Sequence, residues 1–376
     1  MNKVGILTFH ASHNYGSVLQ AYALQNTVNT CCKCDCEIIN FVTDRQKDMY
    51  SIFYNINSLK DILRNVRVRL YKYKIRKDRF EDFNKFIYGN LKLSEKVYRT
   101  KEELESDINK YNTIICGSDQ VWNLTIKDFD YSYFAPFKGD FKKVSYAPSC
   151  GGDEIFNRIL SDEQVKEYIN DFDSLSVREN VAQNMLKKIT DKDISIVLDP
   201  TLLVPKEKWD EICSDRIIKE DYIFLYSIDY NDDVVRMAKN ISKRLNLPVY
   251  ILFNTPSAYK KSLMSFKFAK SESPEDFISL VKNAKLVLSN SFHGTVFSII
   301  YRKAFYVLRG TYDGKINTDD RISTLLGKFK LKDREININN LNEKSISCDV
   351  DYSENEKYIN LEREKSIEYL RNSIVR

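Results

Sequence analysis

Two short polar segments, residues 10–17 and 289–295, hold all three histidines of the chain. In the second segment, His293, Gly294 and Thr295 stand where a helix is expected to begin. The first backbone N–H groups of a helix have no partner within it, so such a helix start binds phosphate or carboxylate groups. His293 could then donate a proton to the bound molecule. The alternative is that His293 only caps the helix.

Arg178 directly follows a predicted strand at residues 174–177. A guanidinium in this position can hold a carboxylate or phosphate through two parallel hydrogen bonds. The alternative is an ion pair with Glu179 or another neighbour. Arg321, in the stretch Asp-Asp-Arg-Ile, is a weaker candidate of the same kind, with the same alternative.

A third polar segment, residues 117–123, follows another predicted strand and contains Asp119 and Trp122. Asp119 and Asp199 could act as general bases, or could cap a neighbouring helix or turn. Trp122 and Tyr15 could stack on a sugar ring, although aromatic residues beside a core are more often part of its packing.

The elements that position these residues alternate between short strands and amphipathic helices, a pattern typical of α/β folds with parallel sheets. In such folds, ligands bind beyond the carboxyl ends of the strands. Ser273 and Pro274 mark a strong helix start. Strands are predicted at residues 4–9, 113–116, 143–147, 174–177, 194–198, 222–228, 249–253, 286–289 and 304–308, and helices at 17–28, 234–245, 273–285, 295–301 and 354–376.

The pattern starts again near Pro205, which indicates two doubly wound domains. We expect an N-terminal Rossmann-like domain over residues 1–205, with a basic helical insertion near 60–99. A C-terminal Rossmann-like domain is expected over 206–350, and a C-terminal helix over 351–376.

Composition and missing motifs exclude several classes of function. The 58 Lys and Arg exceed the 53 Asp and Glu by only 5, so we expect no nucleic-acid partner. No apolar run is long enough for a transmembrane helix, and the first residues resemble a strand rather than a signal peptide, so a cytoplasmic protein is expected. The motifs of dinucleotide-binding, P-loop, α/β-hydrolase and zincin proteins are absent.

Four of the eight cysteines lie between residues 31 and 36, a spacing too close for an ordinary disulfide framework. We interpret this stretch as a loop of reduced thiols rather than a metal site.

Residues 60–79 contain nine Lys or Arg and two Asp, with apolar residues at helical spacing. This pattern indicates either a solvated surface helix, or a helix that contacts an anionic membrane surface or a lipid-pyrophosphate acceptor.

Taken together, the segments resemble the polysaccharide pyruvyl transferase family. The matching stretches are GILTFH at 5–10, NYGSVLQAYALQ at 14–25, CGSDQVWN at 116–123, VSYA at 144–147, LSVRE at 175–179, LDPTLL at 198–203 and SFHGT at 291–295. They follow the order of the family, and the ordered set is more specific than any one stretch.

The resemblance implies two Rossmann-like domains in a GT-B-like arrangement, with the active site in the cleft between them. The acceptor would bind the N-terminal domain and the donor the C-terminal one. It places a donor-binding arginine at Arg178 and a catalytic histidine at His293. Better-known members carry an arginine where this chain has Ser291, so either that positive charge is missing here or Arg321 or Arg309 supplies it.

The activity implied is transfer of a pyruvyl group from phosphoenolpyruvate to two hydroxyls of a sugar in a surface-polysaccharide precursor, giving a cyclic ketal. No metal or other cofactor is expected, and the acceptor could be lipid-pyrophosphate-linked, with peripheral contact at the inner membrane. Two alternatives stay open, a GT-B nucleotide-sugar glycosyltransferase and a non-catalytic glycan-assembly protein. The expected catalytic residues are His293, Arg178 and Asp119; the expected donor-binding residues are Ser291, Gly294, Thr295, Arg321, Asn14 and Gly16; the expected acceptor-binding residues are Tyr15, Ser118, Gln120, Trp122 and Asn123.

Overall fold

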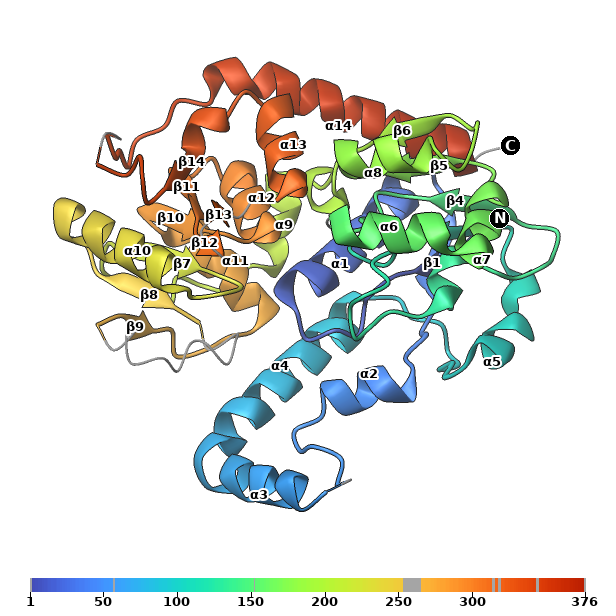
Figure 1. The fold of residues 1–376 in the computed structure, drawn as a ribbon, viewed down its shortest axis with the longest axis horizontal. Helices are drawn as coiled ribbons and strands as arrows, with labels where there is room; N and C mark the ends of the chain where they lie inside the picture. The colour runs from blue at the N-terminus through green and yellow to red at the C-terminus, as the bar shows by residue number, and fades with distance from the viewer. Residues whose placement is uncertain are drawn as a thin grey trace. The chain divides into compact units, whose positions relative to one another are not determined.

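In a computed structural model, the residues of the chain pack into two separate units. Unit 1 comprises Met1–Val204 and Arg363–Arg376, and unit 2 comprises Pro205–Glu362. The structure describes residues 2–56, 58–151, 153–252, 265–312, 315–316, 319–342 and 345–374. Figure 1 shows the elements of both units.

Unit 1 is built on a parallel sheet with the strand order β2-β1-β3-β4. The strand β1 (Lys3–Leu7) is an inner strand, because it pairs with β2 (Asp35–Ile38) on one side and with β3 (Thr113–Cys116) on the other. Its apolar residues are buried. The strand β4 (Lys142–Ser145) pairs with β3 in the same direction. The chain therefore reverses its direction of travel across the sheet between β1 and β3.

Two further strands, β5 (Leu175–Val177) and β6 (Ile194–Ile196), form a parallel pair beside β4. Val144 and Ser174 form a parallel bridge between β4 and β5. Next to it, Ser176 Oγ donates to the Ser145 carbonyl oxygen at 2.7 Å, and Ser145 Oγ donates to the Ser176 carbonyl oxygen at 2.9 Å. These side-chain hydrogen bonds connect β4 to β5, and the pairing of β5 with β6 continues the layer of parallel strands.

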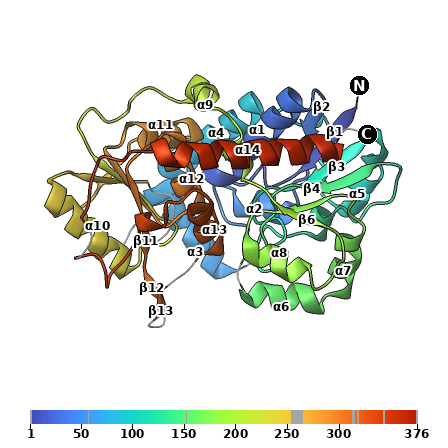
Figure 2. The same ribbon diagram turned by 90° about the horizontal axis from the view of Figure 1, so that it is seen from above.

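The helices of unit 1 cover this layer and add one long insertion. Figures 1 and 2 both show α6, α7 and α8 grouped together. The insertion lies between β2 and β3 and contains α3, α4 and a π-helical turn at Val68–Lys72. The helices are α1 (Tyr15–Cys31), α2 (Asp44–Met49), α3 (Leu59–Arg67), α4 (Tyr73–Asn90), α5 (Lys101–Glu105), α6 (Asp153–Ser161), α7 (Glu163–Asn170) and α8 (Asn180–Leu186), with 3-10 turns at Ile108–Lys110, Tyr131–Phe134 and Pro200–Leu202.

Unit 2 contains a second parallel sheet with the order β14-β11-β10-β7-β8-β9. After β7 the chain adds β8 and β9 on one side of the sheet, and after β10 it adds β11 and β14 on the other side. The reversal in this sheet therefore lies between β7 and β10. Its strands are β7 (Ile223–Tyr226), β8 (Val249–Ile251), β9 (Lys267–Phe268), β10 (Leu286–Ser289), β11 (Phe305–Arg309) and β14 (Glu335–Asn337), and β12 (Thr311–Tyr312) and β13 (Lys315–Ile316) form a separate hairpin.

Local sequence explains where the helices of unit 2 begin and end. At α11, Ser273 and Asp276 form the reciprocal capping pair, with Pro274 at the first helical position. Asn231 caps the start of α10, and Asn246 ends it in the left-handed conformation. The helices are α9 (Lys206–Ile212), α10 (Asp232–Leu245), α11 (Pro274–Asn283), α12 (Phe292–Ile300) and α13 (Asp320–Lys328), with a 3-10 turn at Lys332–Arg334. The last helix, α14 (Ser353–Ile374), begins in unit 2, and its residues from Arg363 onward belong to unit 1.

Most predicted strands and helices are present, with ends that shift by one to three residues. The helix predicted from residue 295 begins at Phe292, with Ser291 at its N-cap. The prediction of a loop for residues 31–36 is wrong at both ends, because Cys31 closes α1 and Cys36 lies in β2. Residue 253, the predicted end of β8, lies outside the described residues. No helix among the described residues is long and apolar enough to cross a bilayer.

Candidate functional site

Most of the predicted functional residues lie at the point in each sheet where the strand order reverses; Arg178, after β5, and Arg321, in α13, do not. In open α/β sheets this point leaves a crevice beyond the carboxyl ends of the strands, where ligands bind. In unit 1, the loops at this point follow β1 and β3 and carry residues 10–17 and 117–123. In unit 2, they follow β7 and β10 and carry residues 227–231 and 290–293.

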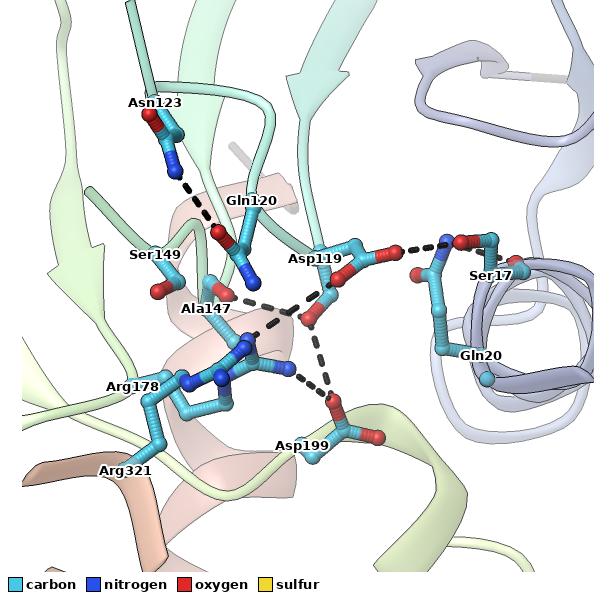
Figure 3. Close-up of polar contacts among 12 residues, drawn as sticks. Ser17, Gln20, Asp119, Gln120, Asn123, Ala147, Ser149, Arg178, Asp199 and Arg321 are labelled. Atoms are coloured by element: carbon cyan, nitrogen blue, oxygen red, sulfur yellow. Dashed lines mark hydrogen bonds and ion pairs between the residues drawn. The ribbon is translucent and has the colours of Figure 1, made fainter. Parts of the chain in front are cut away.

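In unit 1, Asp119 lies just past the carboxyl end of β3, in the left-handed conformation with φ 71°. Its Oδ2 accepts a hydrogen bond of 2.6 Å from Ser17 Oγ, in the first turn of α1. Gly117 brings β3 and β4 close together here, since a Cβ at this position would lie 2.2 Å from the Tyr146 carbonyl oxygen. Figure 3 shows Ser17 and Arg178 on either side of the Asp119 carboxylate.

Arg178 is buried, with three carboxyl groups within 4 Å of its guanidinium nitrogens. The Asp199 Oδ2 atom lies 2.7 Å from Nη1, while Glu179 and Asp119 lie at 3.8 and 3.9 Å. One cation facing three carboxylates leaves this group negatively charged when they are ionised. It therefore suits hydroxyl donors better than a phosphate or carboxylate ligand. The ion pair with a neighbour, the alternative that the sequence left open for Arg178, is what the structure shows.

Three polar residues beside Asp119 were missed by the sequence analysis as functional candidates: Ser17, Gln20 and Thr8. The Gln20 amide nitrogen donates to Thr8 Oγ1 at 2.7 Å and to the Ser17 carbonyl oxygen at 2.9 Å. Gln20 Oε1 is buried and has no hydrogen-bond partner among the described residues. A signal was present in the sequence, because residues 17 and 20 share one face of a helix that follows the loop.

The structure contradicts the two predicted sugar-stacking residues. Trp122 is fully buried, donates its indole N–H to the Tyr133 carbonyl oxygen and stacks on Phe134. Tyr15 is 1% exposed, and its hydroxyl accepts a hydrogen bond from Arg79 at 3.0 Å. Both rings are part of the core, so neither can stack on a bound sugar.

The other predicted acceptor-binding residues are hydrogen-bonded within the same loops. Ser118 Oγ donates to the Ala147 carbonyl oxygen at 3.0 Å and is buried. Asn123 donates to Gln120 Oε1 at 2.7 Å, and its own oxygen accepts from the backbone and hydroxyl of Thr125. Asn123 therefore orders the turn, and the partly exposed Gln120 is the member of this set that a ligand can reach.

The loop after β1 contains two histidines in different surroundings. The His10 ring is buried, 3.1 Å from Asn40 Oδ1 and 3.3 Å from the Thr8 carbonyl oxygen, and burial lowers its pKa. Aromatic rings pack around His13, among them Phe83 at 5.2 Å, and burial, together with the nearby Arg79, lowers the pKa of His13 to about 3. Neither histidine is suited to donate a proton near neutral pH.

Other residues of this loop hold it in place. Asn14 caps α1 by accepting from the Gly16 backbone N–H at 2.9 Å. Asp128 accepts hydrogen bonds from Ser12 at 2.9 Å and from the Tyr50 hydroxyl at 2.6 Å.

In unit 2, Asn290 and Ser289 join the loops after β7 and β10. Asn290 accepts from the Ile228 backbone N–H at 2.9 Å and donates to the Asp229 carbonyl oxygen at 3.1 Å. Ser289 Oγ donates to the Tyr226 carbonyl oxygen at 2.7 Å and accepts from the Ser291 N–H at 3.0 Å. These four hydrogen bonds fix the backbone immediately before α12.

His293 lies in the first turn of α12 with 8% of its surface exposed. The next residue, Gly294, allows the helix to pack against the sheet, because a Cβ there would lie 2.3 Å from Ser289 Oγ. Thr295 is buried, and its hydroxyl donates to the Ser291 carbonyl oxygen at 3.0 Å. Ser291 is the N-cap residue, yet its side chain makes no capping hydrogen bond.

The two candidate replacement arginines have carboxylate partners within unit 2. Arg321 forms a two-pronged pair with Asp319, at 2.9 and 2.6 Å, and its guanidinium lies 5.9 Å from the centre of the Phe292 ring. Arg309 pairs with Glu335 on the neighbouring strand β14. Arg321 is therefore the arginine placed beside the start of α12.

Metal-ligating side chains do not gather within the described part of the chain, where no group of three or more His, Cys, Asp or Glu could hold an ion. All eight cysteines are free. Burial raises the pKa of Cys32 to about 12, so this thiol stays protonated near neutral pH.

Comparisons with known proteins are consistent with this architecture. The polysaccharide pyruvyl transferase family matches residues 14–311. One similar solved structure is UDP-N-acetylglucosamine 2-epimerase from Rickettsia bellii, with 12% sequence identity and a TM-score of 0.56 over 100% of this chain and 97% of that one. Another is UDP-GlcNAc 2-epimerase from Methanocaldococcus jannaschii, with 12% identity and a TM-score of 0.53 over 96% of this chain and 99% of that one. A comparison with curated proteins gives no match. The structural likeness confirms the expected GT-B-like α/β fold with parallel sheets.

Proposed function

Because the chain belongs to the polysaccharide pyruvyl transferase family, we propose that it moves the pyruvyl group of phosphoenolpyruvate onto two hydroxyls of one sugar in a polysaccharide precursor. The product is a cyclic ketal. The observation that supports the proposal is that His293 in unit 2 and Asp119 in unit 1 lie at the reversal points of their sheets, with Asp119 close to the Arg178–Asp199 ion pair. Both lie within the matched residues 14–311.

The chemistry sets what the residues must do. Two sugar hydroxyls each lose a proton and bond to C2 of the donor, whose bond to the phosphate oxygen breaks. One proton ends on the methylene carbon, which becomes a methyl group, and the other ends on the released phosphate. The reaction involves no net oxidation. It needs an acid for the carbon, a base for the hydroxyls and groups that hold the donor anions.

We assign the acid role to His293. Of the three histidines, His10 is buried in hydrogen bonds and His13 has a pKa of about 3, so neither suits proton donation. Around His293, the first turn of α12 offers backbone N–H groups to an anion, with Ser291, Gly294 and Thr295 as the donor-binding segment and Arg321 beside it. Asn14 and Gly16, at the start of α1, stay predicted donor-binding residues, and the Gly16 N–H donates to Asn14 Oδ1 at 2.9 Å.

Asp119 is the base in this proposal. Its carboxylate accepts a hydrogen bond from Ser17 and lies in a negatively charged group that favours sugar hydroxyls. Arg178 holds Asp199 directly and lies close to Asp119, so we assign it a positioning role. Gln120 is the acceptor-binding candidate of the neighbouring loop, and Ser118 and Asn123 hold that loop in place, while Trp122 and Tyr15 lie in the core.

The test is mass spectrometry of candidate glycans incubated with the protein and phosphoenolpyruvate. The expected result is a glycan heavier by one pyruvyl ketal, with equimolar phosphate released. His293→Ala and Asp119→Asn should each lower the rate at least about 100-fold, the usual effect of losing an acid or base. His13→Ala is the matched histidine control, and it should retain activity in its folded fraction.

A thermal-shift titration separates this proposal from the glycosyltransferase alternative. Stabilisation by phosphoenolpyruvate and not by UDP-sugars supports the pyruvyl transfer. Stabilisation by a UDP-sugar alone, or full activity in His293→Ala, would contradict it.

A further inference from the structure

The helix α3 has an apolar stripe that is exposed to solvent. Leu59, Ile62, Leu63 and Val66 follow one another at helical spacing, and Leu70 continues the line. Leu59 is 80% exposed, Leu63 65% and Leu70 66%. Helices of globular proteins normally bury such a stripe against a core. No residue of α3 is buried, so folding of unit 1 does not account for this pattern.

Specific contacts hold α3 in this position. Asn65 bonds to both the backbone N–H and the carbonyl oxygen of Tyr54, each at 2.8 Å. Arg76 in α4 donates to the Ser51 carbonyl oxygen at 2.9 Å, and its guanidinium lies 4.6 Å from the centre of the Tyr54 ring. In Figure 1, α4 leads away from α1, and α3 lies at its far end. The exposed stripe therefore belongs to a defined structure.

A groove of about 690 Å³ opens beside the stripe. The stacked rings of Phe53 and Tyr73, whose centres are 5.8 Å apart, line the groove. Ile62 and Val66 of α3 line it as well. Arg69 also lines the groove. Apolar side chains next to a cation match the boundary between acyl chains and headgroups of a bilayer.

The charge around the stripe is strongly positive. Residues 60–79 contain nine Lys or Arg against two Asp. Lys60, Arg64, Arg67, Arg69 and Lys72 are all exposed. Asp61 forms an ion pair with Arg64 at 3.2 Å and Lys77 forms one with Glu81 at 3.5 Å, and the segment keeps a net positive charge.

We propose that α3 and the turn that follows it dock on a lipid bilayer containing anionic lipids. The cations would lie among the headgroups, and the apolar stripe would enter the headgroup–acyl boundary. A second copy of the chain fits less well, because a two-fold contact would bring the same cationic patch against itself. The inference does not depend on the proposed transferase activity.

The test is sedimentation of the full chain with vesicles of phosphatidylcholine, with and without phosphatidylglycerol. Binding should require phosphatidylglycerol and should fall steeply as NaCl increases. The variant Lys60→Glu/Arg64→Glu/Arg67→Glu should bind about 100-fold more weakly or worse, since each basic residue near an anionic surface contributes roughly fivefold. The matched control Lys138→Glu/Lys187→Glu/Lys188→Glu changes the same net charge at exposed lysines elsewhere in unit 1, and should retain most of the binding.

A second variant, Leu59→Ser/Leu63→Ser/Leu70→Ser, tests the apolar contribution. It should also weaken vesicle binding, and because these side chains are exposed it should fold normally. Absence of binding to anionic vesicles, or equal binding by α3 variants and control, would overturn the proposal. So would a wild-type dimer in light scattering that the Leu variant converts to a monomer, since a second copy would then cover the stripe.

Discussion

Gly294→Ala should destabilise unit 2, although alanine is normally the better helix former. The new methyl group would lie 2.3 Å from Ser289 Oγ and 3.0 Å from both Ser289 Cβ and Tyr226 Cδ1. Ser289 cannot simply turn away, because its hydroxyl bonds to the Tyr226 carbonyl oxygen and the Ser291 N–H. The substitution therefore forces α12 away from the sheet and breaks at least one of those two hydrogen bonds.

The magnitude follows from three contributions. Overpacking a filled core costs about 1–3 kcal/mol. Losing a hydrogen bond costs about 1 kcal/mol, and replacing glycine by alanine in a helix gains about 1 kcal/mol. The last two are similar in size and opposite in sign, so the net loss should be about 2 kcal/mol in the free energy of unfolding. His293 lies next to the methyl group, so activity in the folded protein should fall as well.

Gly327→Ala, in α13 of the same unit, is the matched control. A Cβ there would meet only the Cε atom of Lys332 at 3.3 Å, the end of a flexible side chain. The free energy of unfolding of this variant should equal that of the wild type or exceed it by up to about 1 kcal/mol.

Urea unfolding followed by tryptophan fluorescence measures both variants. Each unit contains one of the two tryptophans, and the ring centre of Trp209 lies 4.9 Å from that of Phe297 in α12. A Trp122→Phe background therefore reports unit 2 alone. If Gly294→Ala is as stable as Gly327→Ala, the close packing inferred between α12 and β10 is wrong.

Three further predictions concern unit 1. Burial raises the pKa of Asp128 above its ordinary 3.8, so this group should make the folded wild type less stable as pH rises from about 4 through that raised pKa. Asp128→Asn should lack this loss, and equal pH dependence of the urea midpoints of the two proteins would contradict the prediction. Asp199→Asn keeps an oxygen that accepts from the Thr201 N–H but removes the negative charge nearest Arg178. It should lower the free energy of unfolding by about 3 kcal/mol, as measured by Trp122 fluorescence, and a loss below about 1 kcal/mol would count against the ion pair. Trp122→Phe should leave the acceptor KM unchanged, because the ring is buried; a large rise in KM would place it in the site after all.

Loop positions were predictable because they depend on local pattern. The strands at Thr113–Cys116 and Leu286–Ser289 are short apolar runs followed by polar residues, and both were located correctly. The capping residues at Ser273 and Pro274 are equally local. By contrast, β2 was missed although its four residues, Asp35–Ile38, alternate between polar and apolar types, because the run is short and the cysteines around it were interpreted as a loop; pairing with β1 makes it a strand.

The sequence by itself determined the α/β class, the order of the elements and the loops that carry His293, Asp119 and Arg178. Each of these depends on residues close together in the chain. Only the tertiary structure decided that Arg178 faces Asp199, that Trp122 lies in the core and that the apolar face of α3 meets solvent. Burial and ion pairing depend on which distant segments pack together, and residue type and spacing do not encode that directly.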